Sequence, residues 1–122
     1  NGFPNLLMVA GPQSVSGSTN FPRAIETGVD WVTELLEHTL DNGHTRLEAQ
    51  AEAEAEWVEE VVRAHERMLF RRSKGWFTGY NANVAGHQEG KIRYQAYFGG
   101  APRYSETIVQ ATAQGYPRID MS

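Results

Sequence analysis

The feature that most constrains the fold is a short apolar run near the start of the chain. Residues 5–10 read Asn-Leu-Leu-Met-Val-Ala and are followed by Gly11-Pro12. A continuous apolar run that ends in Gly-Pro is typical of a strand buried on both faces. Such strands belong to parallel sheets covered by helices, and the chain offers no second run of this kind. We therefore expect an α/β fold with one buried core strand whose partner strands lie elsewhere.

The length and composition are those of one small domain, and the start of the chain suggests a piece of a larger protein. The chain has 122 residues, of which 40% are hydrophobic, and it starts at Asn1 rather than at Met. It contains no cysteine, which excludes disulfides and thiolate metal sites. No apolar run approaches the roughly 20 residues of a membrane helix, and no signal peptide is visible. We expect a cytoplasmic fragment of a longer chain, without membrane contact.

A first long helix is expected after the apolar run, from about residue 22 to residue 41. Thr19 or Asn20 can cap its start, and Pro22 suits its first turn. Asn42-Gly43 supplies a stop. The apolar residues between these signals recur at helical spacing: Ile25, Val29, Val32, Leu36 and Leu40.

A second long helix is expected from residue 45 to about residue 70. Thr45-Arg46-Leu47-Glu48 has the Thr-x-x-Glu form of a capping box, and an alanine- and glutamate-rich stretch follows it. The link to the first helix is short, which favours antiparallel packing of the two. His65 falls on the apolar side of this helix, where a structural histidine is more common than a metal ligand.

The last third of the chain reads as a loop-rich stretch with one strand and a final helix. Residues 81–90 should be loop, and residues 92–98 alternate in polarity as a half-buried strand does. In this alternation Ile92 faces the core, whereas Tyr97 faces solvent. Pro102 opens the final helix, which should end at Gly115.

The connection between the apolar run and the first helix is one candidate ligand site. Ligands of open α/β sheets bind beyond the carboxyl ends of the strands, and Gly11-Pro12 lies at such an end. The start of the following helix carries unpaired N–H groups and a partial positive charge, which stabilise negative charge on a ligand. An ordinary connection between a strand and a helix would show the same pattern.

Trp76 is the other candidate, because it lies in a loop-like stretch close to Lys74. An exposed tryptophan near cations can stack on a dinucleotide or donate its indole N–H to it. Alternatively, Trp76 anchors the C-terminal segment to a core. The histidines stand in no metal-binding spacing, and no Gly-x-Gly-x-x-Gly or P-loop occurs.

Charge is unevenly distributed and leaves two other functional classes open. Residues 26–66 contain 12 acidic and two basic residues, whereas residues 67–103 contain seven basic residues and one acid. The acidic helices could form a stand-alone interaction module without enzymatic activity. The basic, aromatic stretch 70–104 could contact phosphate, including that of a nucleic acid.

Several motifs along the chain resemble one family in order. Residues 2–14, GFPNLLMVAGPQS, look like the last core strand of Baeyer–Villiger monooxygenases, which are class B flavoprotein monooxygenases. Residues 19–32 resemble the helix that follows in that family. Residues 76–83, WFTGYNAN, and 99–104, GGAPRY, resemble its C-terminal part. The resemblance covers nearly the whole chain.

The resemblance implies the C-terminal part of an enzyme that holds FAD and NADP in dinucleotide-binding folds. NADPH reduces the flavin, O2 reacts with it, and one oxygen atom is inserted beside the carbonyl of a ketone to give an ester or lactone. Residues 1–43 would be the last core strand and helix of the FAD-binding domain. Residues 44–70 would connect this domain to a C-terminal extension, 71–122, and the missing N-terminal portion of the enzyme would be the partner. No nucleic acid is expected.

The resemblance also implies roles for particular residues. Phe21 corresponds to a residue that lies against the flavin, and we assign Asn20 to the same cofactor site. The residue matching Trp76 contacts NADP. The loop that precedes Phe21 helps to line the substrate pocket through Ser16, Gly17, Ser18 and Thr19.

The family's catalytic machinery is not found in this chain. Its two glycine-rich fingerprints, its Phe-x-Gly-x-x-x-His-x-x-x-Trp signature and its catalytic arginine all lie upstream of the matching segment. We therefore expect no catalytic residue here and no activity of the fragment alone. Val15 replaces a proline that is common in the family, and Phe21 stands where relatives often carry Met. These two departures make the substrate pocket harder to infer from the family. The Tyr80-Asn81-x-Asn83 motif resembles that of family members that act on bulkier cyclic ketones.

Overall fold

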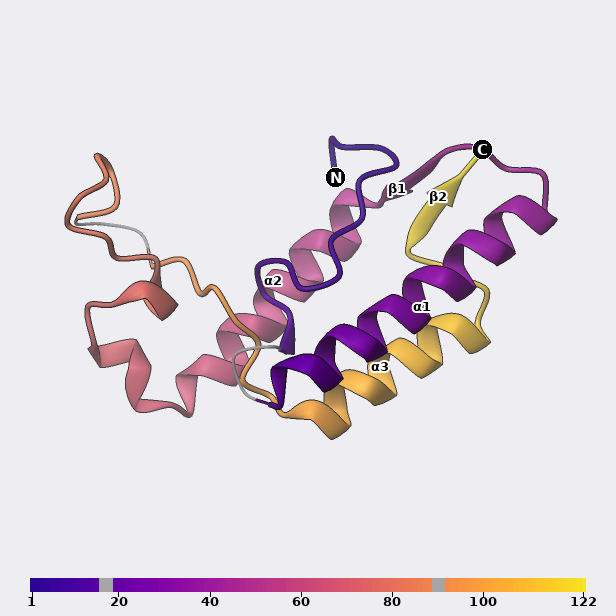
Figure 1. Ribbon diagram of the computed structural model, residues 1–122. Helices are drawn as coiled ribbons and strands as arrows, with labels where there is room; N and C mark the ends of the chain where they lie inside the picture. The colour runs from indigo at the N-terminus through magenta and orange to yellow at the C-terminus, as the bar shows by residue number, and fades with distance from the viewer. Residues whose placement is uncertain (16–18, 89–91) are drawn as a thin grey trace.

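The structure is a computed structural model in which the described residues form α-helices, a small sheet and 3-10 turns (Figure 1). It describes residues 1–15, 19–88 and 92–122. In chain order the elements are α1 (Phe21–Asp41), β1 (Leu47–Ala49), α2 (Ala51–Glu66), η2 (Leu69–Arg72), η3 (Trp76–Thr78), α3 (Ala101–Ala113) and β2 (Ile119–Met121).

The sheet lies at one end of the helices and the 3-10 turns lie at the other (Figure 1). As expected, α1 and α2 run in opposite directions, but α3 lies along α1 (Figure 1). Two small cores hold them together. One is built around Val15, Val61 and Tyr97, and the other around Leu35, Leu47 and Tyr116.

The first helix has the bounds that its end signals predicted. The side chain of Asn20 caps it by accepting a hydrogen bond from the Arg23 N–H at 3.2 Å. Asn42 is the C-cap, and Gly43 follows with a φ of 74°, a left-handed conformation that glycine adopts without strain. The final helix is also confirmed, as α3.

The predicted capping box at Thr45 is wrong. The backbone N–H groups of Thr45 and Arg46 donate to the carbonyl oxygen of Ser122, each at 2.8 Å. Leu47 then pairs with Met121 in an antiparallel ladder between β1 and β2. Because the far end of the chain satisfies these backbone groups, the second helix starts only at Ala51. It ends at Glu66 rather than near residue 70.

Residues 5–10 do not form the predicted core strand. Asn5 adopts a φ of 60° and donates its N–H to the Leu47 carbonyl, which bends the chain away from an extended path. Leu6 and Met8 are 59% and 63% exposed. Among the described residues the one sheet is β1–β2, so this run has no strand to pair with. A buried strand needs neighbours on both edges and both faces.

Residues 92–98 form no regular strand, and the predicted alternation holds at Ala96, which is 2% exposed, but not at Tyr97 or Ile92. Tyr97, expected to face solvent, is 1% exposed, whereas Ile92 lies at the surface. Tyr97 is drawn inward by its contacts with Trp57 on α2 and Tyr104 on α3. Packing against α2 and α3 therefore overrides the local polarity pattern.

Candidate functional site

The start of α1 presents an aromatic ring to its surroundings. Phe21 is the first residue of the helix, and its side chain is 51% exposed. Pro22 has no N–H group, and the Arg23 N–H is used by Asn20. The helix start therefore keeps its partial positive charge but offers fewer free N–H groups than the sequence suggested.

The loop before α1 is only partly described. Ser16, Gly17 and Ser18, which were assigned to the substrate pocket, lie outside the described residues. Thr19 is half-buried beside Asn20 at the helix start. On the other side of the loop, Val15 is buried against Val61 and Tyr97. The loop is thus fixed to the helical core at both of its described ends.

The extended segment 93–97 joins the two candidate sites, which are far apart in sequence. On one side, the Gln13 N–H donates to the Gln95 carbonyl at 2.8 Å, and the Tyr97 N–H donates to the Ser14 carbonyl at 2.9 Å. These bonds tie the segment to the loop that leads to α1. No local pattern in the sequence indicated this pairing, since it joins residues that are far apart along the chain.

On the other side, the same segment holds the turn that carries Trp76. The Arg93 N–H donates to the Thr78 carbonyl, and the Gln95 N–H donates to the Phe77 carbonyl, both at 3.1 Å. Gly79 closes the turn with a φ of 74°, and a Cβ there would come within 2.9 Å of the Arg93 Cβ. Glycine is required at this position by both its conformation and the close approach.

Trp76 projects from this turn and is 68% exposed. Its ring meets that of Phe77 nearly at right angles, with centroids 5.4 Å apart. The Lys74 ammonium lies over the ring of Tyr80 at 5.7 Å rather than over Trp76. Trp76 is therefore no anchor to a core within the described part of the chain, and one face of its indole is available to a planar ligand.

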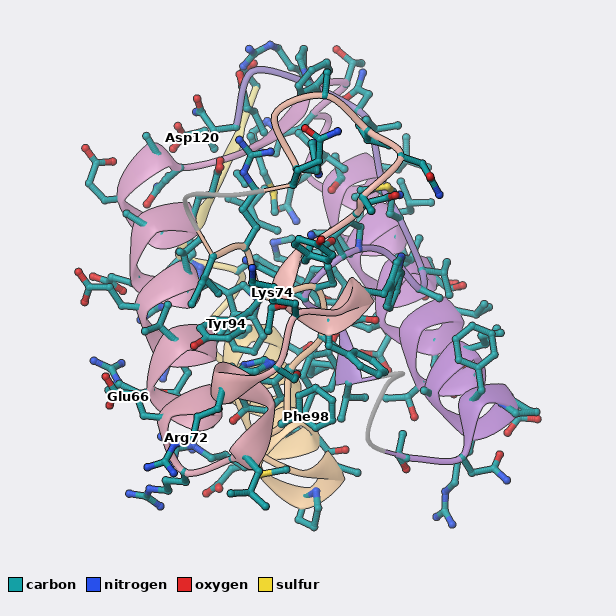
Figure 2. All side chains as sticks on the ribbon, turned by 90° about the vertical axis from the view of Figure 1, so that its left-hand side faces the viewer. Glu66, Arg72, Lys74, Tyr94, Phe98 and Asp120 are labelled. Carbon is teal, nitrogen blue, oxygen red and sulfur yellow. The ribbon has the colours of Figure 1, made fainter. Side chains whose placement is uncertain are left out.

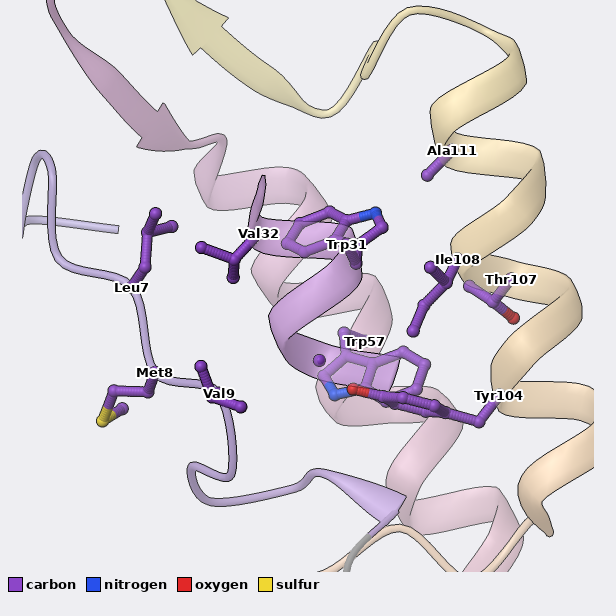
Figure 3. A pocket seen from close by; sticks show the side chains of 11 residues that line it. Leu7, Met8, Val9, Trp31, Val32, Trp57, Tyr104, Thr107, Ile108 and Ala111 are labelled. Carbon is purple, nitrogen blue, oxygen red and sulfur yellow. The ribbon is translucent and has the colours of Figure 1, made fainter. Parts of the chain in front are cut away.

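An apolar pocket of about 230 Å³ opens between the N-terminal segment and the helices (Figure 3). Leu7, Met8 and Val9 line one side, and the opposite side comes from α3 (Figure 3). Trp31 of α1 and Trp57 of α2 form its floor. This lining can hold an apolar group; Tyr104 and Thr107 bring its hydroxyl groups, and no carboxylate, imidazole or amine side chain lines it.

Gly28 allows the N-terminal segment to approach α1. A Cβ on Gly28 would come within 2.8 Å of the Val9 carbonyl oxygen. Close contact between a chain and a helix commonly requires glycine at the contact point. Gly28 was not among the residues expected from the sequence, although an isolated Gly inside a helical pattern is the signal that could have found it.

The ionisable groups do not form a catalytic cluster. Among residues 1–15, 19–88 and 92–122, no group of three His, Asp or Glu side chains could hold a metal ion. The acidic face of α2 is partly neutralised, because Glu60 pairs with Arg63 at 3.1 Å and with Arg103 at 2.8 Å. No helix in the same part of the chain is long and apolar enough to cross a bilayer.

No family model matches the chain, but it is similar to individual proteins over nearly all of its length. It is 34% identical to cyclopentanone 1,2-monooxygenase of a Comamonas species over 99% of this chain and 21% of that protein. It is 31% identical to cyclohexanone 1,2-monooxygenase of an Acinetobacter species, again over 99% of this chain and 21% of the relative. The chain therefore spans about a fifth of the length of the curated relatives it matches.

Solved structures show the same similarity in the fold. A closed form of cyclohexanone monooxygenase superposes with a TM-score of 0.86 at 33% identity, over 98% of this chain and 21% of that structure. An oxidized steroid monooxygenase bound to NADP superposes with a TM-score of 0.84 at 28% identity, over 99% and 21%. Sequence and fold thus point to flavoprotein monooxygenases, one matched protein being the FAD-binding monooxygenase VdtE of Byssochlamys spectabilis, at 32% identity over 98% of this chain and 20% of that protein.

Within that class, the resemblance to the Baeyer–Villiger monooxygenases is confirmed along the whole chain. One matched protein, from Pseudooceanicola batsensis, carries the family's name, at 30% identity over 96% of this chain and 20% of that protein. The alternative of a stand-alone acidic interaction module gains no support from these similarities.

Proposed function

We propose that this chain is the C-terminal segment of an FAD-containing, NADPH-dependent Baeyer–Villiger monooxygenase. The complete enzyme inserts one oxygen atom of O2 beside the carbonyl of a ketone and releases an ester or lactone. The observation that carries this proposal is the match of nearly the whole chain, in sequence and in fold, to cyclopentanone and cyclohexanone monooxygenases. When bound, FAD supplies the redox chemistry, and NADPH supplies the electrons.

The start of α1 is proposed to contact the flavin. Phe21 offers an exposed aromatic surface, and Asn20 fixes the helix start by capping it. The positive end of the helix dipole favours the negative charge of a reduced flavin. The residues present therefore fit a planar, partly anionic ring system, and their role is to position it.

The turn at Trp76 is proposed to contact NADP. Its exposed indole can stack on a ring of the dinucleotide or donate its N–H group to it. The loop of Ser16, Gly17, Ser18 and Thr19 is proposed to line the ketone site. Since segment 93–97 is bonded to both the Trp76 turn and the loop before α1, this geometry supports placing NADP and substrate contacts on one connected unit.

The rest of the enzyme is proposed to cover the apolar surface of this segment. Leu6 and Met8 are exposed beside the apolar pocket, and Leu36 and Leu40 are exposed along α1. In the complete enzyme residues 5–10 would gain strand neighbours and complete the sheet of the FAD-binding domain. We retain residues 1–43 as part of that domain, 44–70 as the connection and 71–122 as the extension. A cytoplasmic location stays a prediction.

The test is the behaviour of the full-length protein. We expect it to purify with bound FAD and to oxidise NADPH faster when a cyclic ketone is added, with an ester or lactone as product. The segment alone should show neither reaction. A full-length protein that binds no flavin would contradict the proposal.

A further inference from the structure

His65 is the most deeply buried polar residue outside the candidate sites. It lies in the last turn of α2, and its side chain is 0% exposed. The imidazole stacks on the ring of Tyr94, with centroids 3.8 Å apart and planes inclined by 17°. The edge of Phe98 closes another side, at a centroid distance of 4.9 Å.

The hydrogen bonding of His65 defines its protonation state. Nδ1 lies 2.9 Å from the Val61 carbonyl oxygen. A carbonyl only accepts, so Nδ1 carries the proton, and Nε2 is the bare nitrogen of a neutral imidazole. Nε2 is buried and has no partner among the described residues. A second proton would therefore place both a charge and an unsatisfied donor in an apolar site.

Among the side chains that the structure describes, the rings around His65 come from Tyr94 and Phe98. Tyr94, on the extended segment, is the titratable group in contact with it, and Phe98 is apolar. The charged side chains of Glu66 and Arg72 point away into solvent, whereas Tyr94 and Phe98 lie inward of α2 (Figure 2). Burial lowers the pKa of His65 and outweighs the bond to Val61, which acts in the opposite direction. The end of the α2 dipole also favours a cation, but by only about 1 kcal/mol.

The contacts of His65 lead directly to the Trp76 turn. Tyr94, on which it stacks, lies between Arg93 and Gln95, whose N–H groups hold the Thr78 and Phe77 carbonyls. Phe98 in turn packs edge-on against Phe77 at 5.5 Å. A displacement of Tyr94 and Phe98 would therefore loosen both attachments of η3.

We propose that neutral His65 positions the turn that carries Trp76, and that protonation of His65 releases this turn. The consequence, which rests on the proposed function, is a pH-dependent contact with NADP. His65 does not touch cofactor or substrate. It acts through the stacked ring of Tyr94 and the two backbone hydrogen bonds beside it.

The linkage has a defined sign. The folded site excludes the proton, whereas an opened site binds it with the ordinary histidine pKa of about 6.5. The closed form is therefore fully favoured above that pH, and its advantage is lost as the pH falls below it. One unit lower, at about pH 5.5, opening should be roughly tenfold more favourable than at about pH 7.5.

The test uses the full-length flavoenzyme and measures amide hydrogen exchange at Arg93 and Gln95, expressed as protection relative to the free peptide rate at each pH. Between about pH 7.5 and pH 5.5 we expect roughly tenfold loss of protection in the unmodified enzyme. His65→Phe keeps an aromatic ring and cannot titrate, so its protection should be independent of pH. His44→Gln is the matched control and should behave as the unmodified enzyme does.

His65→Gln provides a second neutral variant in case the phenylalanine variant folds poorly. The proposal is overturned if the unmodified enzyme shows no pH-dependent loss, or if either neutral variant loses protection as the unmodified enzyme does. The KM for NADPH should follow the same pH profile, with kcat little affected. If Trp76→Ala leaves that KM unchanged at every pH, the NADP contact at Trp76 is wrong, while the exchange result still decides the role of His65.

Discussion

The phenol oxygen of Tyr97 occupies the place where a side chain on Gly99 would begin. A Cβ built on Gly99 would overlap the hydroxyl and the adjoining ring atoms of Tyr97. Tyr97 cannot easily move away, because its ring is buried among the helices and its hydroxyl donates to Glu60 Oε1 at 3.3 Å. Residue 99 must therefore be glycine for the segment to turn into α3.

Gly99→Ala should consequently destabilise the protein. Forcing the buried ring of Tyr97 out of its site should cost about 1–3 kcal/mol of unfolding free energy. Gly75→Ala is the matched control, since Gly75 has an extended φ of −170° and no atom lies within 4 Å of the place that an added methyl group would take. Thermal unfolding of the full-length protein checks both. Equal melting temperatures for the two variants would contradict the packing described for Tyr97.

Tyr97 also predicts a loss of stability at high pH. Burial and the Glu60 carboxylate raise the pKa of its phenol, while Arg103 acts in the opposite direction. The unfolded chain releases this proton near pH 10, so the contribution of Tyr97 is complete below about pH 10 and is lost as the pH rises through its folded pKa. Unfolding free energy measured from neutral to alkaline pH should fall less steeply in Tyr97→Phe. If unfolding free energy falls equally steeply with pH in the unmodified protein and in Tyr97→Phe, the phenol of Tyr97 is not buried as described.

Trp76→Ala should raise the KM for NADPH by about tenfold, through loss of a stacking contact worth roughly 1–2 kcal/mol. The melting temperature should hardly change, because the side chain is largely exposed. Leu69→Ala, at an even more exposed apolar residue on the preceding turn, is the control and should leave the KM unchanged. Steady-state kinetics with varied NADPH distinguish the two. A Trp76 variant that mainly lowers stability would instead indicate a structural role.

Phe21→Ala should alter turnover and ketone preference without a large effect on stability. Phe21 is half-exposed in this segment, so its removal leaves little cavity, whereas the flavin would lose the surface against which it rests. Phe3→Ala is the comparison, since Phe3 is exposed but distant from the start of α1 in sequence. Flavin reduction rates and ketone-dependent turnover are the measurements. Identical kinetics in both variants would remove Phe21 from the cofactor site.

Local sequence signals predicted the helices well. Asn20 and Asn42-Gly43 end α1 through contacts within one turn of the chain, and such contacts can be recognised from a short pattern. The Thr-x-x-Glu pattern at Thr45 is equally local, but no helix starts there. The backbone N–H groups of Thr45 and Arg46 donate to the Ser122 carbonyl instead. Pairing between the middle and the end of the chain has no signature within a few residues.

The candidate site could be predicted only in part. Phe21 and Trp76 are both exposed, and their contacts with the flavin and NADP stay predictions. The backbone hydrogen bonds that tie segment 93–97 to the loop before α1 and to the Trp76 turn were not predicted, because they join residues far apart along the chain. Residues 5–10 present the opposite case, since their apolar sequence predicts neighbours that this segment does not itself contain.

The most direct test of the central claim is the fate of oxygen in the full-length enzyme. The purified flavoenzyme would be supplied with NADPH, cyclohexanone and isotopically labelled O2, and the product would be analysed by mass spectrometry. We predict a lactone that carries a single labelled oxygen atom, formed in step with NADPH consumption. Consumption of NADPH that yields only hydrogen peroxide, with a panel of other cyclic ketones giving the same result, would contradict this assignment.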